Sequence, residues 1–183
     1  MLFNTLAAGH PQSAVDLVKT LNPRDFELLK LDIVEMEIRD APSSANKRLP
    51  MLFKLLEDRD ANPYDRVRVM ELLSVMDLAE EDLDRFSQIL VEDIQLLGRT
   101  KKIPSYSSEP EAAICVAPAI TALSQLPHPE KHAGVVAATI LPSWWVFDAA
   151  VEYLATCASL TPEQRTRHLE TLVRPRFSHH GGL

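Results

Sequence analysis

Helix-start signals recur along this chain and constrain its fold more than any other feature. Proline directly follows a capping residue at Asn22-Pro23, Asn62-Pro63 and Thr161-Pro162. Asparagine and threonine side chains accept hydrogen bonds from the free N–H groups of a first helical turn, and proline fits the first helical position without losing a bond. The chain is therefore expected to start a new helix at each of these signals.

Apolar side chains recur at helical spacing between these signals. The clearest seam precedes Gly98, which should end its helix, and it consists of Leu83, Phe86, Leu90, Ile94 and Leu97. Similar seams are formed by Leu49, Leu52, Phe53 and Leu56, and by Val69, Leu72, Leu73 and Met76. We expect an all-α protein of eight or nine short helices, paired as antiparallel hairpins in a helical-repeat-like array or an irregular helical bundle.

The balance of glycine and proline supports this fold class. The chain has 5 glycines and 13 prolines. Few glycines allow few tight turns with positive φ, which argues against an all-β fold, whereas prolines suit helix starts and connections. A hydrophobic fraction of 46% with 25% charged residues is typical of a soluble globular protein.

A long uncharged run extends from Ala133 to Phe147. We interpret it as parts of two buried helices, Glu130–Leu141 and Trp144–Ala158, that meet at Pro142-Ser143. The run is too short to span a bilayer, which needs about 20 apolar residues. It predicts the driest part of the core and no membrane span.

We expect a single all-α domain over residues 1–173, followed by a flexible tail at 174–183. A polar loop at 98–108 separates an acidic first half, residues 1–97, from a charge-poor second half, residues 109–173. The first half carries 11 Lys and Arg against 19 Asp and Glu, a net charge of −8. Because such a surface repels phosphate, no nucleic-acid partner is expected.

The basic side chains concentrate only near the C-terminus, at Arg165, Arg167, Arg174 and Arg176. Four scattered charges are typical of a solvated helix face. The two cysteines, Cys115 and Cys157, lie in apolar helical surroundings and are expected to be buried core residues in a reducing compartment. The N-terminus has no basic segment of the secretory type. A cytoplasmic protein is therefore predicted, with export lacking a readable signal left open.

Motifs for catalysis or cofactor binding are absent from the sequence, so no catalytic, cofactor-binding or metal-binding residue is assigned. The best metal-like pair is His128 and His132, at i and i+4, without an evident third ligand. Cys115 has only apolar neighbours, which argues against a reactive thiolate. An alternative hypothesis remains: a small helical metal-binding protein or enzyme that uses His128, His132 and nearby carboxylates.

The adjacent residues Trp144 and Trp145 must serve different faces of one helix, because successive helical positions differ by about 100°. Trp144 is in line with Phe147, Val151 and Leu154, so we expect it in the core. Trp145 is in line with Asp148 and Glu152. The sequence leaves two alternatives for Trp145: coverage by a neighbouring helix, or partial exposure beside the two carboxylates, a typical composition for a protein-binding anchor.

One internal similarity suggests a repeat. Asn22-Pro-Arg-Asp25 and Asn62-Pro-Tyr-Asp65 lie 40 residues apart, and aligning them also matches Met36 with Met76. This period resembles that of HEAT and armadillo repeats, at the level of fold only. The resemblance implies stacked helical hairpins that present an extended surface to another protein.

Our first functional hypothesis is a non-enzymatic α-helical protein–protein interaction module of the adaptor, chaperone-like or effector type. Its candidate binding residues are Trp145, Asp148 and Glu152. The expected partner is another protein, with no cofactor. Self-association through the apolar second half is compatible with this hypothesis.

Overall fold

The structure is a computed structural model, and it describes residues 31–32, 34–38, 46–98, 111–140 and 143–177. Contacts along the backbone divide the chain into two compact units, residues 1–45 and 46–183. The described residues of the first unit are helical, and Leu31 and Val34 are buried. The Asn22-Pro23 signal lies outside the described residues. The single domain over residues 1–173 stays a prediction.

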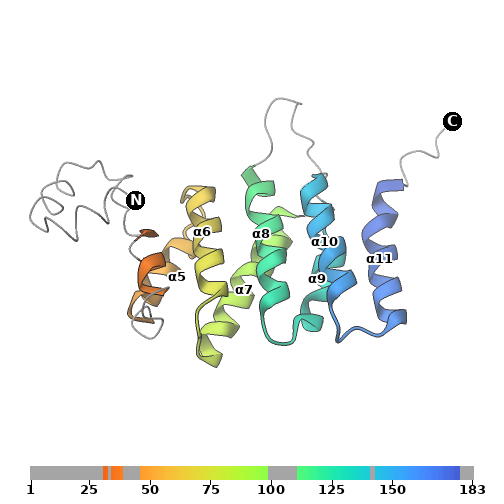
Figure 1. Cartoon of the computed structure of the whole chain (residues 1–183). Helices are drawn as coiled ribbons and strands as arrows, with labels where there is room; N and C mark the ends of the chain where they lie inside the picture. Colours follow the sequence, from red (N-terminus) through yellow and green to blue (C-terminus); the bar gives the residue numbers. More distant parts are fainter. Residues whose placement is uncertain (1–30, 33, 39–45, 99–110, 141–142, 178–183) are drawn as a thin grey trace, which may run out of the picture. The chain divides into compact units, whose positions relative to one another are not determined.

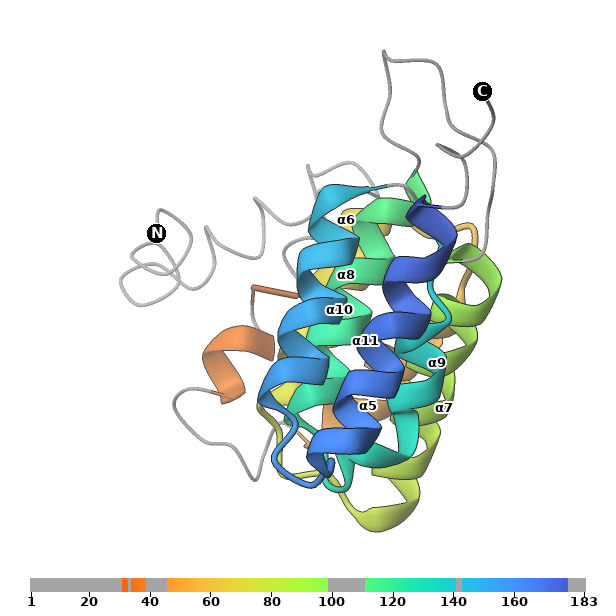
Figure 2. The same cartoon turned by 90° about the vertical axis from the view of Figure 1, so that its right-hand side faces the viewer.

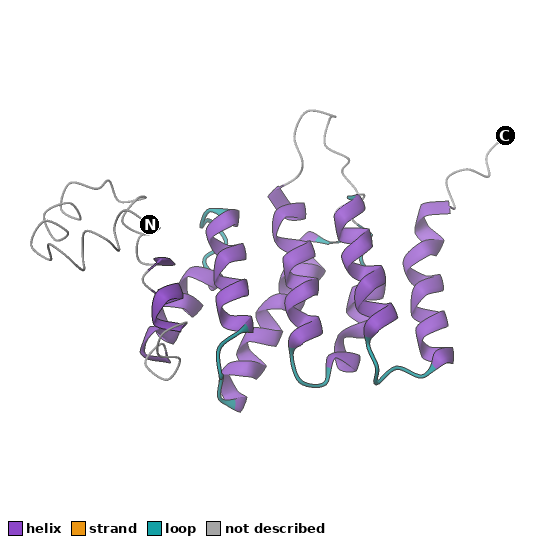
Figure 3. Cartoon of the chain, viewed as in Figure 1, coloured by secondary structure: helices purple, strands orange, loops and turns teal. Residues whose placement is uncertain are grey.

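The described part of the second unit is built from helices and contains no strand (Figure 3). This confirms the predicted all-α class. In chain order the elements are η1 (Asn46–Arg48), α5 (Leu49–Glu57), α6 (Pro63–Ser74), α7 (Glu80–Leu97), α8 (Glu111–Gln125), η2 (Pro129–His132), α9 (Ala133–Ala137), α10 (Trp144–Thr156) and α11 (Pro162–Phe177).

The helices of the second unit lie in two layers. Helices α6, α8 and α10 lie side by side in one layer, and α5, α7 and α9 form the other (Figures 1 and 2). Each helix of the first layer packs on the helix that precedes it in the chain, as α5 with α6, α7 with α8 and α9 with α10. Helix α11 packs against both α9 and α10. Within the second unit the predicted hairpins are therefore present, while the HEAT-like identity of the repeat stays a prediction.

The helix-start signals work as expected where they are described. The Asn62 side chain accepts a hydrogen bond of 2.9 Å from the Tyr64 N–H, with Pro63 at the first helical position of α6. Thr161 and Gln164 form a reciprocal capping box at the start of α11, in which each side chain accepts from the other residue's N–H, at 3.2 and 2.9 Å. These local bonds explain why the sequence locates both helix starts well.

Gly98 caps the C-terminus of α7, as predicted. Its carbonyl accepts a hydrogen bond of 2.9 Å from the Ile140 N–H, which joins the end of α7 to the segment after α9. A Cβ atom at this position would collide with the Ile94 carbonyl oxygen and lie 3.2 Å from Thr139 Cγ2. Only glycine permits this close approach without a shift of the backbone.

Two predicted boundaries need correction. Helix α11 continues to Phe177, so residues 174–177 of the predicted tail are helical. Proline disfavours the helical conformation of the residue before it, yet the helix continues past Pro175. The predicted helix Glu130–Leu141 is also shorter, because a 3₁₀ turn precedes α9, which ends at Ala137.

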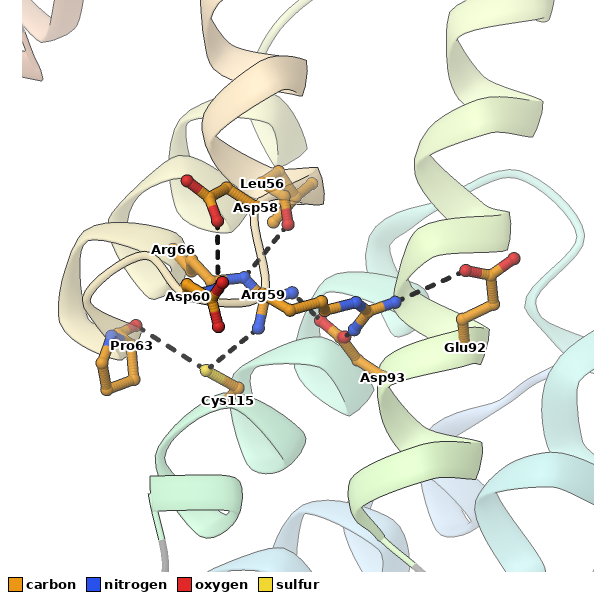
Figure 4. A network of polar contacts seen from close by, with 9 residues as sticks. All are labelled: Leu56, Asp58, Arg59, Asp60, Pro63, Arg66, Glu92, Asp93 and Cys115. Atoms are coloured by element: carbon orange, nitrogen blue, oxygen red, sulfur yellow. Dashed lines mark hydrogen bonds and ion pairs between the residues drawn. The ribbon is translucent and has the colours of Figure 1, made fainter.

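A buried ion-pair network joins α6 with α7 and α8 (Figure 4). Arg66, on α6, places Nη2 2.6 Å from Asp93 Oδ2 on α7 and donates from Nε to the Leu56 carbonyl at 3.0 Å. Arg59 pairs with the other carboxylate oxygen of Asp93. The Cys115 thiol on α8 lies 3.9 Å from Arg66 Nη1. Burial lowers the pKa of the Arg66 guanidinium, yet an arginine remains protonated in proteins.

This network was not predicted from the sequence, because Asp93 lies on the inner face of an otherwise ordinary amphipathic helix. Its side chain is completely buried, and Arg66 is 4% exposed. Carboxylates at such positions are expected only with a paired cation. The network holds α6, α7 and α8 in register from inside the fold.

In the described part of the chain, no helix combines the length and apolar character that crossing a membrane requires.

Candidate functional site

An open groove of about 580 Å³ lies across α6, α8 and α10 of the second unit. Its floor is a stripe of α8 made of small side chains, among them Ala117, Pro118 and Thr121. Pro118 lies inside α8, where a proline removes one helical hydrogen bond. The small residues of the floor leave space between the larger side chains of the two flanking helices.

The wall on the α6 side is formed by Glu71, Ser74 and Val75. Val75 follows the last residue of α6 and exposes 66% of its surface. The Ser74 hydroxyl donates to the Met70 carbonyl at 2.7 Å, within its own helix. This wall therefore presents an exposed apolar side chain beside one carboxylate.

The wall on the α10 side carries both tryptophans, together with Asp148, Ala149 and Glu152. Trp144 is 66% exposed and Trp145 is half-buried. The two rings lie against each other, with centroids 4.4 Å apart and planes tilted by 57°. Asp148 and Glu152 follow one and two turns after Trp144 on the same helix. Aromatic surface and carboxylates thus lie together on one wall.

The exposure of Trp144 corrects the prediction that it belongs to the core. The buried residues of α10 are Val146, Ala150, Tyr153 and Leu154. Trp144 precedes Val146 by two positions, about 200° around the helix, so it points away from the buried face. The prediction failed because it took the seam of Phe147, Val151 and Leu154 as the buried face, whereas the buried face is centred on Val146, Ala150 and Tyr153. Trp145 is half-buried, an outcome between the exposure and the coverage that the sequence left open for it.

The groove brings the three predicted binding residues together with elements that the sequence did not connect to them. Trp145, Asp148 and Glu152 all line it. The sequence gives no indication that the α6 and α8 residues belong to this groove, because tertiary packing determines which distant helices lie side by side. Trp144 was visible in the sequence but was assigned to the opposite face.

The groove has an acidic character. Of the described residues that line it, three are acidic and none is Lys, Arg or His. The acids are Glu71, Asp148 and Glu152, all exposed. Within the described part of the chain their carboxylates form no ion pair or hydrogen bond. The groove therefore offers unpaired negative charge next to aromatic surface.

A second hollow, of about 300 Å³, differs in this respect. Its charged side chains neutralise one another: Arg85 Nε donates to Glu57 Oε1 at 2.8 Å, and Arg59 Nη2 donates to Glu92 Oε2 at 3.4 Å. Little charge is left there to recognise a partner. The groove on α6, α8 and α10 is the better candidate.

The hydroxyl groups of the groove do not form a nucleophile–base pair. Thr121 Oγ1 donates to the Ala117 carbonyl at 3.1 Å, and Ser74 is engaged within α6 as described. Both hydroxyl protons are held by backbone carbonyls, and an activated nucleophile needs a base as its acceptor instead. In this arrangement the Ser74 and Thr121 hydroxyl groups are hydrogen-bonded within their own helices.

The alternative metal site has the following geometry. His128 lies between two prolines in a left-handed conformation, with φ 58° and ψ 50°, and its Nδ1 is 3.5 Å from Glu130 Oε1. His132 is half-buried, and burial lowers its pKa. Among the described residues, no three His, Cys, Asp or Glu side chains are grouped to hold a metal ion. His128 and His132 thus lack a third protein ligand in that part of the chain.

The remaining candidates lie apart from the groove. Cys115 and Cys157 are free thiols and are buried, as predicted. Arg165 donates to the Cys157 carbonyl at 3.1 Å, while Arg167 and Arg174 are exposed. The side chain of Arg176 is outside the described residues.

Comparison with protein-family models, with curated proteins and with solved structures finds no significant match to this chain. The groove must therefore be interpreted from its own geometry and chemistry.

Proposed function

We propose that this chain is a non-enzymatic protein–protein interaction module and that a partner protein docks in the groove on α6, α8 and α10. The single observation that carries the proposal is Trp144, a tryptophan 66% exposed at the rim of this groove. Tryptophan is among the residues most enriched at the energetic centres of protein interfaces. A large exposed ring has an unfavourable contact with water, which a partner would remove.

The composition of the groove supports docking by a polypeptide. Exposed Val75 and exposed Trp144 stand on opposite walls, and small residues lie between them. A volume of about 580 Å³ accommodates several side chains of a helix or an extended segment. Helix-in-groove recognition uses apolar anchors of this kind in a groove between helices.

Pro118 adds an independent argument. An interior helix proline costs about 3 kcal/mol relative to alanine, and Pro118 lies on the floor of the groove. Departures from local folding rules of this kind are expected at functional sites, where they are compensated elsewhere in the structure. We interpret Pro118 as a residue that shapes the floor of the groove between α6 and α10.

The test is a selection of displayed random peptides on the full-length protein. We expect enriched peptides to bind the wild type and to lose at least tenfold in affinity for a Trp144→Ala, Val75→Ser double variant. Leu96→Ala is the matched control, because Leu96 is equally exposed at 66% but lies on α7 outside the groove. Peptides that bind all three proteins equally, or a selection without any specific binder, would contradict the proposal.

A further inference from the structure

We infer that the segment docking in this groove is positively charged, with an arginine or lysine side chain stacked on Trp144 and its charge facing Asp148 and Glu152. This inference rests on the proposed docking function and names the chemistry of the partner. The occupant is a segment of another protein in which basic and apolar residues alternate at helical spacing.

The charge of the two walls carries the inference. Glu71 projects from α6, and Asp148 and Glu152 project from α10, so carboxylates flank the groove on both sides. None of the three is neutralised by a described residue. Elsewhere on the described surface, Glu57 pairs with Arg85 and Glu92 pairs with Arg59. An array of like charges without cations favours a cationic ligand and repels an anionic one.

Trp144 adds a specific place for one cation. Its exposed ring can accept a guanidinium or ammonium group over its face, an arrangement for which tryptophan is the best of the aromatic side chains. Asp148 lies four residues further on, and on a helix such residues are neighbours on the same face. A cation over the Trp144 ring therefore meets a carboxylate within reach of its outer side.

The apolar part of the occupant has its own contacts. Val75 stands on the wall of α6, Ala117 lies on the floor and Ala149 lies on the wall of α10, and all three contribute apolar surface to the groove. These residues suit aliphatic side chains one helical turn away from the cation. A segment that carries only charge would leave this apolar surface exposed to water.

The acidic groove also distinguishes the class of partner. Phosphate groups of nucleic acids or membrane lipids would meet three carboxylates at close range and would be repelled. A basic protein segment meets both the charge and the apolar surface. The inference therefore commits to a polypeptide.

The test uses three synthetic helical peptides that share leucines at helical spacing and differ only in carrying lysine, glutamine or glutamate at the remaining positions. The chain has two tryptophans, and both line the groove, so intrinsic fluorescence of the full-length protein reports occupancy directly. We expect the lysine peptide to bind at least tenfold more tightly than the glutamine peptide, and the glutamate peptide to show no binding. Raising the salt concentration from 50 to 300 mM should weaken the lysine peptide selectively.

Variants locate the effect within the groove. Asp148→Asn combined with Glu152→Gln should weaken the lysine peptide at least fivefold and leave the glutamine peptide unchanged. The control pair, Glu81→Gln with Asp84→Asn, removes the same charge from exposed positions of α7 and should have no effect.

The outcomes separate the two proposals. Equal binding of the lysine and glutamine peptides, both lost in Trp144→Ala, would overturn the cationic partner and leave the docking groove in place. The cationic partner would also be overturned if the Asp148→Asn, Glu152→Gln variant and the control variant weakened binding of the lysine peptide equally, because the attraction would then be non-specific. If no peptide binds and the display selection yields no groove-dependent binder, the docking function itself fails.

Discussion

The buried Asp93 provides a strong test of how the scaffold of the groove is held together. Its side chain is 0% exposed, and its partner Arg66 is 4% exposed. Replacing Asp93 with leucine leaves the Arg66 guanidinium buried without a carboxylate. Removing one partner of a buried pair typically costs 3–5 kcal/mol of folding free energy, because the other charge remains uncompensated.

The structure places this variant near the lower end of that range. Arg66 keeps its hydrogen bond of 3.0 Å to the Leu56 carbonyl, and Arg59, whose side chain is 35% exposed, can turn into water. We expect Asp93→Leu to lower the free energy of unfolding by about 3 kcal/mol. The double variant Asp93→Leu, Arg66→Met removes both buried charges, and it should be more stable than the single variant.

Urea denaturation followed by circular dichroism measures these differences. The matched control is Glu57→Gln, which breaks an ion pair whose side chains are 48% and 44% exposed and should cost less than about 1 kcal/mol. A loss below about 1 kcal/mol for Asp93→Leu would refute the argument. The argument would also be refuted if the double variant lost as much unfolding free energy as Asp93→Leu and Arg66→Met lose separately, added together, because the two residues would then not be coupled.

Three further predictions follow from the fold. Gly98→Ala should lower the free energy of unfolding by about 1–3 kcal/mol in the same denaturation assay, because its Cβ has no room; an unchanged midpoint would contradict the close approach. Asn62→Ala should cost about 1 kcal/mol through loss of the cap on α6, and Asn62→Asp, which keeps an acceptor, should not; equal losses would contradict the capping role. Acrylamide should quench a Trp145→Phe variant, which retains Trp144, more strongly than a Trp144→Phe variant; the reverse order would contradict the exposure of Trp144.

The sequence predicts this fold well where the determinants are local. Asn62 and Thr161 start helices because their side chains reach N–H groups two or three residues away, and Gly98 ends α7 at the predicted position. The seam of Phe86, Leu90 and Ile94 is buried as its spacing predicts. These features depend on a few neighbouring residues, so the sequence contains them directly.

The groove could be predicted only in part. The orientation of Asp148 and Glu152 relative to Trp145 follows from helical geometry within one element, and all three do line one surface. Their neighbours across the groove, Glu71 and Val75, could not be predicted, since nothing local connects α6 with α10.

The main error of the sequence-based prediction was to assign Trp144 to the buried face of its helix. Helical spacing places Trp144 and Leu154 within one apolar arc, but the arc that is buried centres on Val146, Ala150 and Tyr153. Asp93 shows the opposite case, a charged residue accepted by the core because Arg66 and Arg59 pair with it. The periodicity of a sequence classifies side chains only as apolar or polar. It does not show which residues of other helices contact them.

The most direct test of the docking groove is the nuclear magnetic resonance spectrum of the ¹⁵N-labelled full-length protein during titration with the lysine peptide. The chain has two tryptophan indole N–H groups, both in the groove, so their resonances can be assigned with one Trp144→Phe variant. The account predicts that both resonances shift progressively to saturation, with the larger change at exposed Trp144. Indole resonances that stay in place while the peptide saturates another surface of the chain would contradict it.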